Sequence, residues 1–184
     1  MRKIDPQFEN PVDNILIDIA DKASSAFKSA NFTPNYLTTI SLFLGLMSAY
    51  YLYIRNNKMA TILFILAYYF DVMDGHFARK YNMVSEFGDY YDHFSDWIKY
   101  LAILYAMYKV DSNKIYYVVI VIGILFMLQN IHLGCQEKMY ESSVDQPLLQ
   151  YTKMLCPDPS YIQYTRYFGC GTLAFIMAIL IYFY

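Results

Sequence analysis

The hydrophobic positions of this chain fall into long blocks separated by short polar links. Three blocks, residues 36–54, 115–133 and 168–184, are apolar and contain no Asp, Glu, Lys or Arg. A helix rises about 1.5 Å per residue, so each block is long enough to cross most or all of the ~30 Å hydrocarbon layer of a bilayer. The pattern therefore predicts three membrane-spanning helices.

Two further apolar blocks, residues 59–70 and 97–108, are too short to cross alone. The first reaches spanning length only if its helix continues through Asp71 and Asp74, and the second only if its helix begins near Gly88. We therefore expect five spans, of which the second and third carry acids at the ends nearest the loop between them. A sixth, weakly apolar crossing within residues 146–165 stays open.

Residues 11–30 have apolar and acidic side chains at helical spacing, as in Ile15, Asp18 and Ile19. This pattern is typical of an amphipathic helix lying along a membrane surface. We expect residues 1–35 to form an N-terminal interfacial region and residues 36–184 to form a transmembrane domain. The predicted fold is an all-α integral membrane protein with five to six transmembrane helices.

Composition agrees with this fold and excludes some functions. The chain is 57% hydrophobic and only 16% charged, below the ~25% charged residues of soluble domains. Its net charge is −2 and it has no basic stripe, so we expect no nucleic-acid partner. The three cysteines are far apart and form no CxxC pair, which predicts free thiols rather than a zinc site or a disulfide framework.

The basic residues predict the orientation. If the N-terminus lies in the cytosol, most Lys and Arg residues lie on that side, and only Arg55, Lys58, Lys109 and Lys114 lie on the other. We therefore expect a multi-pass protein whose acidic segment faces the cytosol; the sequence does not indicate which membrane holds it.

Four acids mark the candidate site. Asp71 and Asp74 are three residues apart on one predicted helix, and Asp92 and Asp96 are four apart on the next, so each pair shares a helix face. We expect the two helices to pack as an antiparallel hairpin that brings the four carboxylates into one cleft. Such charges beside hydrocarbon need a positive partner, and hard divalent cations, Mg²⁺ by default, suit oxygen ligands.

Two neighbouring residues add phosphate chemistry to this acidic site. Two divalent ions about 3.5–4 Å apart can stabilise both oxygens of a phosphoryl displacement. Gly75 leaves room for phosphates near the backbone, and Arg79, one turn later, offers a forked donor for them.

The run Asp71-x2-Asp74-Gly75-x2-Ala78-Arg79-x8-Gly88-x3-Asp92-x3-Asp96 resembles the signature of the CDP-alcohol phosphotransferases at every fixed position and gap. The segment "TPNYLT", residues 33–38, is similar to the start of the family's first span. This resemblance implies a helical membrane enzyme with six core spans. It also implies transfer of a substituted phosphoryl group from a CDP-linked donor to an alcohol, with release of CMP and use of two Mg²⁺ or Mn²⁺ ions.

The resemblance also implies residue roles. Asp71, Asp74 and Asp92 would hold one ion, and Asp71, Asp92 and Asp96 the other, with Asp96 taking the proton from the acceptor hydroxyl. Further residues would contact or line the site of the cytidine diphosphate part: Gly75, Arg79, Ser85, Pro34, Asn35, Tyr36 and Leu37. At least one substrate would be a lipid, and a homodimer stays open because family members often form dimers.

The sequence leaves the substrates open. The run "FDVMDGHFAR" resembles phosphatidylinositol synthases, which favours a phosphatidyl donor and a small polar alcohol. "NPVDNILIDIADK" and the Asp92-His93 pair are faintly similar to choline/ethanolamine-type phosphotransferases, in which diacylglycerol is the acceptor. A carboxylate-lined cation channel or transporter is the alternative of another class, but its acids would be spread through several spans.

Overall fold

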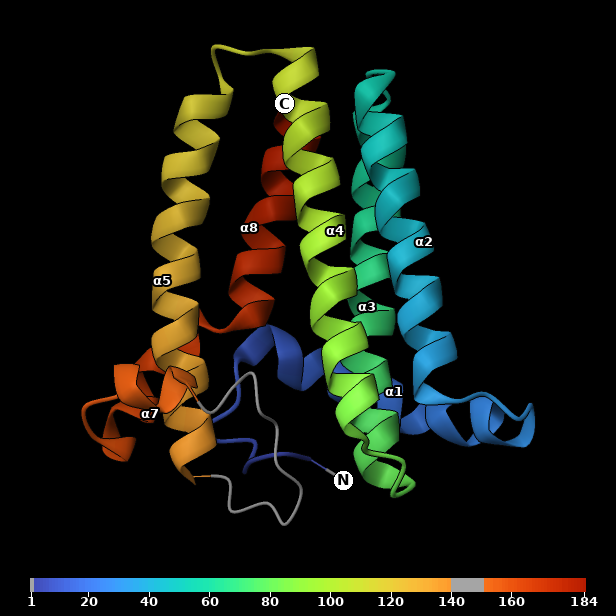
Figure 1. The fold of residues 1–184 in the computed structure, drawn as a ribbon, viewed down its shortest axis with the longest axis vertical. Helices are drawn as coiled ribbons and strands as arrows, with labels where there is room; N and C mark the ends of the chain where they lie inside the picture. The colour runs from blue at the N-terminus through green and yellow to red at the C-terminus, as the bar shows by residue number, and fades with distance from the viewer. Residues whose placement is uncertain (1, 140–150) are drawn as a thin grey trace.

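A computed structural model describes residues 2–139 and 151–184, and all its regular structure in these ranges is helical. The long helices α2 (Pro34–Tyr53), α3 (Asn57–Lys80), α4 (Glu86–Val110), α5 (Ile115–Met139) and α8 (Cys170–Phe183) stand side by side (Figure 1). Helix α1 (Pro11–Ser29) lies across one end of this bundle. The all-α prediction is confirmed.

The N-terminal helix begins at a well-formed cap. The Asn10 side chain accepts a hydrogen bond from the Val12 N–H, and Pro11 occupies the first helical position, where a missing N–H costs nothing. Ala20 of α1 is fully buried against Met73 and Phe77 of α3. The predicted helix is therefore present, and one of its faces anchors it to the bundle.

Helix α2 is the central packing element, because it contacts both α3 and α4 extensively. Small residues let it approach α3 closely: Ser41 Oγ donates to the Ala67 carbonyl at 2.9 Å, and Ser48 Oγ donates to the Ala60 carbonyl at 2.8 Å. The prediction that α3 and α4 pack directly against each other as a hairpin is wrong. The two helices are antiparallel, but their backbones stay apart.

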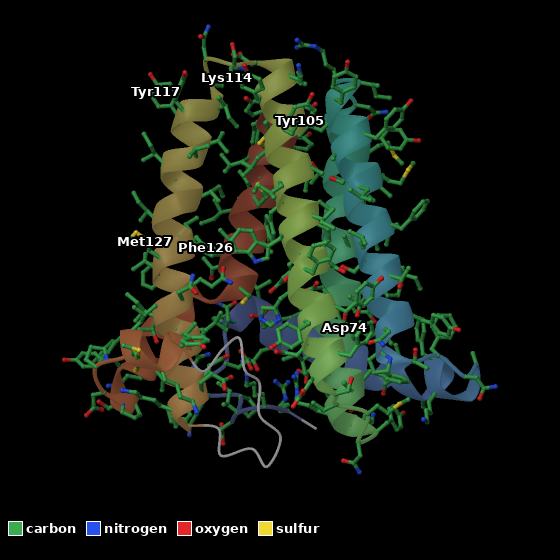
Figure 2. All side chains as sticks on the ribbon, in the orientation of Figure 1. Asp74, Tyr105, Lys114, Tyr117, Phe126 and Met127 are labelled. Atoms are coloured by element: carbon green, nitrogen blue, oxygen red, sulfur yellow. A yellow bond between two sulfur atoms is a disulfide. The ribbon has the colours of Figure 1, made fainter. Side chains whose placement is uncertain are left out.

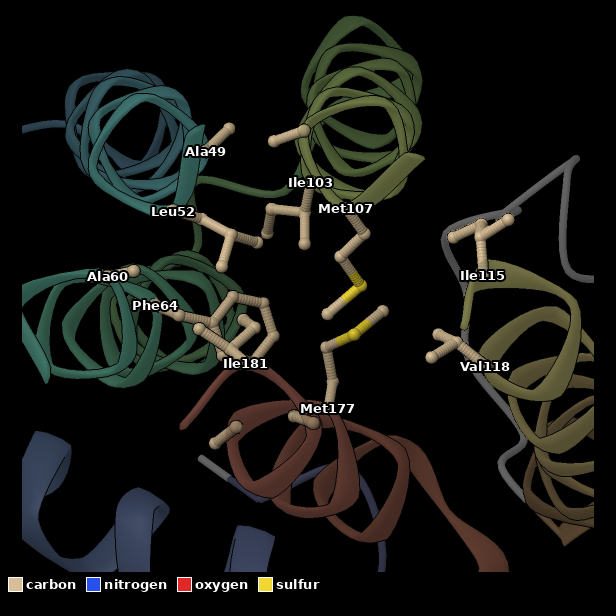
Figure 3. Close-up of a cluster of buried hydrophobic side chains, with 13 residues drawn as sticks. Ala49, Leu52, Ala60, Phe64, Ile103, Met107, Ile115, Val118, Met177 and Ile181 are labelled. Carbon is tan, nitrogen blue, oxygen red and sulfur yellow. The ribbon is translucent and has the colours of Figure 1, made fainter. Parts of the chain in front are cut away.

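The largest apolar core lies towards the end of the bundle that is remote from α1. Leu52 of α2, Phe64 of α3, Met107 of α4 and Met177 of α8 are all buried there, and the two methionines point towards each other (Figure 3). This core joins the helices at one end, and the polar groups gather at the other.

Short helical turns connect α5 to α8: η1 (Tyr151–Leu155), η2 (Pro159–Tyr161), α7 (Ile162–Thr165) and η3 (Arg166–Phe168). The first part of the possible sixth crossing, 146–150, lies outside the described residues, and its remainder is these short turns. Two described stretches, Ile115–Met139 and Pro159–Phe183, are long and apolar enough to cross a membrane. The predicted span count is not confirmed.

The cysteine prediction is wrong for two of the three residues. Cys135 at the end of α5 and Cys156 form a disulfide, and only Cys170 is a free cysteine. The two half-cystines are 21 residues apart, and their spacing has no recognisable sequence signature. Cys135 and Cys156 pack with Ile162, Ile4 and Phe8 in a small separate core that ties the N-terminal segment to the α5–α8 connection.

We expect one reactive thiol, that of Cys170, when the unfolded and unreduced protein is titrated with a maleimide, and three after reduction. Reduction should also lower the free energy of unfolding by about 3 kcal/mol, because the unfolded chain regains the freedom of a loop of this length. Three reactive thiols before reduction would show that the disulfide is absent. The Cys170→Ser variant serves as the control for the unpaired cysteine.

Candidate active site

Three of the four predicted acids converge. One carboxylate oxygen each of Asp71, Asp74 and Asp92 lies within 4.8 Å of the other two. Asp71 and Asp74 come from α3 and Asp92 from α4, in the half of the bundle nearer α1, where Asp74 is labelled in Figure 2. The backbones of α3 and α4 are separated there, so these side chains reach into the space between the helices.

Helix α2 orients two of these carboxylates. Thr38 Oγ1 donates a buried hydrogen bond of 2.7 Å to Asp74 Oδ2, and Ser41 Oγ lies 3.5 Å from Asp71 Oδ1. Asp74 is almost completely buried. A buried carboxylate is stable only with donors or cations around it, so the polar positions of α2 are part of the site.

Asp96 belongs to a second part of the same cluster. Its Oδ1 lies 2.7 Å from Lys99 Nζ, and the same ammonium lies 2.6 Å from Asp71 Oδ1. Sequence reasoning missed Lys99. The signal was available, because Lys99 is a charged residue inside an apolar block and stands three positions after Asp96 on the same helix face.

The donor set of the three convergent acids suits a hard divalent cation. Carboxylate oxygens are the ligands that Mg²⁺ and Mn²⁺ prefer. In addition, Asp92 Oδ1 is buried and has no hydrogen-bond partner, which is costly unless a cation or water satisfies it. Asp71, Asp74 and Asp92 therefore fit a metal ion, whereas Asp96 contacts Lys99 and is not among the three convergent acids.

The predicted phosphate-binding residues lie around the same cavity. A Cβ atom on Gly75 would meet Arg79 Nη1 at 3.3 Å, so the guanidinium lies over the bare glycine. A Cβ atom on Gly88 would lie 3.1 Å from Ser85 Oγ and 3.5 Å from Asn35 Oδ1, which places those two polar groups together. Ser85 also caps α4 by accepting from the Gly88 N–H.

Two residues implied to line the pocket do not line it. Pro34 and Asn35 do, but Tyr36 is 61% exposed and Leu37 is fully buried against α1 and α3. Successive residues at the start of a helix point in directions about 100° apart, so four in a row cannot all face one pocket.

The cavity at the aspartates has a volume of about 760 Å³ and changes character along its length. Polar groups of the N-terminal segment and α5, including Lys3, Glu9 and Gln136, line it beside the carboxylates. Away from them it is apolar and runs between α4 and α5, where the lining residues are Tyr100, Leu101, Leu104, Val119, Ile122 and Phe126. The acids therefore stand at the junction of a polar region and an apolar groove.

Asp13 of α1 also lines this cavity. Its Oδ1 accepts from the Tyr68 hydroxyl at 2.6 Å, and its Oδ2 accepts from the Gly171 N–H at 3.1 Å, so it joins α1, α3 and α8. Burial raises the pKa of Asp13 to about 7, although these hydrogen bonds favour the carboxylate.

The sequence of this chain is similar to a known family of enzymes. Residues 31–184 match the sequence model of the CDP-alcohol phosphatidyltransferases. The chain is 29% identical over 107 residues to an archaetidylinositol phosphate synthase of Pyrococcus horikoshii, a match that covers 58% of this chain and 53% of that protein. It is 34% identical over 82 residues to a CDP-diacylglycerol–glycerol-3-phosphate 3-phosphatidyltransferase of Rickettsia felis, covering 43% of this chain and 45% of the relative.

The chain thus spans only about half the length of these curated relatives. No solved structure matches it significantly.

Asp13 should make the stability of the protein depend on pH. Its pKa is about 7 in the folded protein and near 4 in the unfolded chain, so between these values the folded state binds more protons. The free energy of unfolding should therefore fall as pH rises from 4 to 7, by up to about 1.4 kcal/mol per pH unit. Asp13→Asn should flatten this slope, measured by chemical unfolding in detergent.

Asp18→Asn, an exposed acid on the same helix, is the matched control for that measurement. Equal pH slopes in wild type and Asp13→Asn would contradict the assignment.

Proposed function

Because the chain belongs to the CDP-alcohol phosphatidyltransferase family, we propose that it transfers a phosphatidyl group from a CDP-linked donor to an alcohol and releases CMP. The observation that carries this proposal is the position of Asp71, Asp74 and Asp92 at the junction of a polar region and an apolar groove. A donor with a nucleotide head and acyl chains needs both environments on either side of its reacting phosphate.

The convergent carboxylates are the proposed metal ligands. Asp71, Asp74 and Asp92 would hold one divalent cation, Mg²⁺ or Mn²⁺, and by the family resemblance Asp71, Asp92 and Asp96 would hold a second. Such ions stabilise negative charge on the oxygens of a phosphoryl displacement. The buried, unpartnered Asp92 Oδ1 supports this assignment, because a cation at that position would satisfy it.

Asp96 is the proposed general base. A base must lie within hydrogen-bond reach of the acceptor hydroxyl, and Asp96 lines the cavity beside the convergent acids. It accepts the hydroxyl proton while the acceptor oxygen attacks the phosphorus, and the bond to the CMP oxygen breaks. Asp96 is held by Lys99 through Oδ1.

The remaining predicted residues bind the nucleotide end of the donor in this proposal. Arg79 over Gly75 gives a forked cation for a diphosphate, and the paired Asn35 and Ser85 side chains offer polar groups beside Gly88. All four residues line the cavity that contains the carboxylates.

The apolar groove between α4 and α5 favours an acyl-bearing donor over a small soluble one. Its lining side chains include Leu101, Leu104 and Ile122, which match hydrocarbon and not a headgroup. The two named relatives carry out synthesis of an inositol phosphate lipid and phosphatidyl transfer to glycerol 3-phosphate, as their names state. These names support a small polar acceptor rather than diacylglycerol.

A bilayer around the bundle is also part of the proposal. Large apolar side chains face outward on several helices, including Phe43 of α2, Ile62 of α3, Tyr105 of α4 and Ile120 of α5, each more than half exposed. Five spans with a cytosolic active site fit the distribution of Lys and Arg. The four acids all come from α3 and α4 of one chain, and a homodimer stays a prediction.

The disulfide bears on this orientation. Cys135 lies near the end of α5 that is at the same end of the bundle as α1 (Figure 1), the end nearer Asp74 (Figure 2). The cytosol of most organisms keeps thiols reduced. The disulfide therefore opposes a cytosolic active site, whereas the distribution of Lys and Arg favours one.

Asp96→Asn should lower CMP release by about 10²–10⁴-fold, because a general base contributes that much. The assay follows CMP from detergent-purified protein with Mg²⁺ or Mn²⁺, a CDP-diacylglycerol and a panel of alcohols. Asp111→Asn, at the far end of α4, is the matched control and should leave the rate unchanged. Normal turnover by Asp96→Asn would refute the base assignment, and no CMP from any donor with wild-type protein would refute the proposed function.

A further inference from the structure

One lysine is built into the aspartate cluster. Lys99 is 5% exposed, and its ammonium lies 2.6 Å from Asp71 Oδ1, 2.7 Å from Asp96 Oδ1 and 2.7 Å from Ser41 Oγ. An ammonium has three N–H donors, so these three partners use its full capacity. Elements α2, α3 and α4 each supply part of this arrangement.

The fold makes room for the stem of this side chain. A Cβ atom on Gly45 of α2 would lie 2.6 Å from Lys99 Cγ and 2.8 Å from Cδ, so no larger residue fits there without moving the lysine. Ser41, one turn from Gly45, is itself fixed by its hydrogen bond to the Ala67 carbonyl. The lysine is therefore held along its whole length, unlike a surface lysine that extends to solvent.

The ammonium of Lys99 lies where it reduces the repulsion between Asp71 and Asp96. Asp71 is the shared member: one of its oxygens lies near Asp74 and Asp92, and its Oδ1 contacts Lys99. Without the lysine, Asp71 and Asp96 would be neighbouring carboxylates in a poorly solvated site, and they would turn apart. A metal ion stabilises the group only while it is bound, whereas Lys99 is covalently present at all times.

We propose that Lys99 is a positioning residue that acts as an internal counter-ion. It holds Asp71 and Asp96 in the orientation needed for the reaction and weakens the affinity of the cluster for divalent cations. The positioning of Asp71 and Asp96 for the reaction rests on the proposed function. The effect of Lys99 on cation binding does not. The second effect follows from Coulomb repulsion, since a fixed positive charge near a cation site lowers its affinity.

Removal of Lys99 should change the cation affinity and the turnover rate in opposite directions. This difference distinguishes a positioning role from a structural one. Replacing Lys99 by the neutral Met should tighten cation binding, because a repelling charge is removed, and should slow turnover, because Asp96 loses its orientation. A lysine that only supported the fold would, when removed, weaken cation binding and turnover together.

The experiment measures Mn²⁺ binding to the purified, detergent-solubilised full-length protein by electron paramagnetic resonance of free Mn²⁺, and CMP release on the same samples. Lys99→Met should bind Mn²⁺ at least tenfold more tightly than wild type and have a kcat at least tenfold lower. Lys99→Arg keeps the charge and should bind Mn²⁺ within threefold of wild type. Lys109→Met, an exposed lysine further along α4, is the matched control and should match wild type in both measurements.

Ser41→Ala provides a second test if Lys99→Met does not fold. It removes one of the three ammonium partners and should tighten Mn²⁺ binding about threefold, because the lysine is less firmly held beside the acids. Unchanged or weaker Mn²⁺ binding in folded Lys99→Met, or in Ser41→Ala where only that variant folds, would overturn the proposal. If wild type binds Mn²⁺ but releases no CMP, the proposed function fails while the Mn²⁺ affinities still decide the role of Lys99.

Discussion

The structure depends on balancing like charges in a poorly solvated site. Asp71, Asp74, Asp92 and Asp96 are grouped among apolar helices, where each unpaired carboxylate would cost several kcal/mol. Positive charge and hydrogen-bond donors offset that repulsion. Lys99 supplies one positive charge, and a divalent cation among Asp71, Asp74 and Asp92 is the proposed second source.

Several features of the bundle serve this balance. Small residues let α2 approach α3 and α4 closely. Its polar residues Thr38 and Ser41 point towards Asp74, Asp71 and Lys99. The backbones of α3 and α4 stay apart while α2 contacts both. Helices α4 and α5 make few contacts with each other, and the apolar groove of the cavity lies between them. The apolar core around Met107 and Met177 holds the other end together, so the site can stay open without loss of the fold.

The sequence predicted what depends on spacing along one helix. The intervals between the acids put Asp71 with Asp74 on one helix face and Asp92 with Asp96 on the next, and the hydrophobic blocks gave the long helices. The sequence did not predict contacts between elements that are far apart along the chain. The Cys135–Cys156 bond, the insertion of α2 between its neighbours and the fit of Lys99 against Gly45 are of this kind. The resemblance assigned Tyr36 and Leu37 to the pocket, and helix geometry turns both away.

Asp71, Asp74 and Asp92 are proposed to form one cation site. The most direct test of this proposal is a crystal structure of the protein grown with Mn²⁺ and measured at the manganese absorption edge. We expect an anomalous peak within coordination distance of Asp71, Asp74 and Asp92, with Lys99 still in contact with Asp96. A structure at saturating Mn²⁺ without a peak among these three carboxylates, or with their side chains pointing apart, would contradict it.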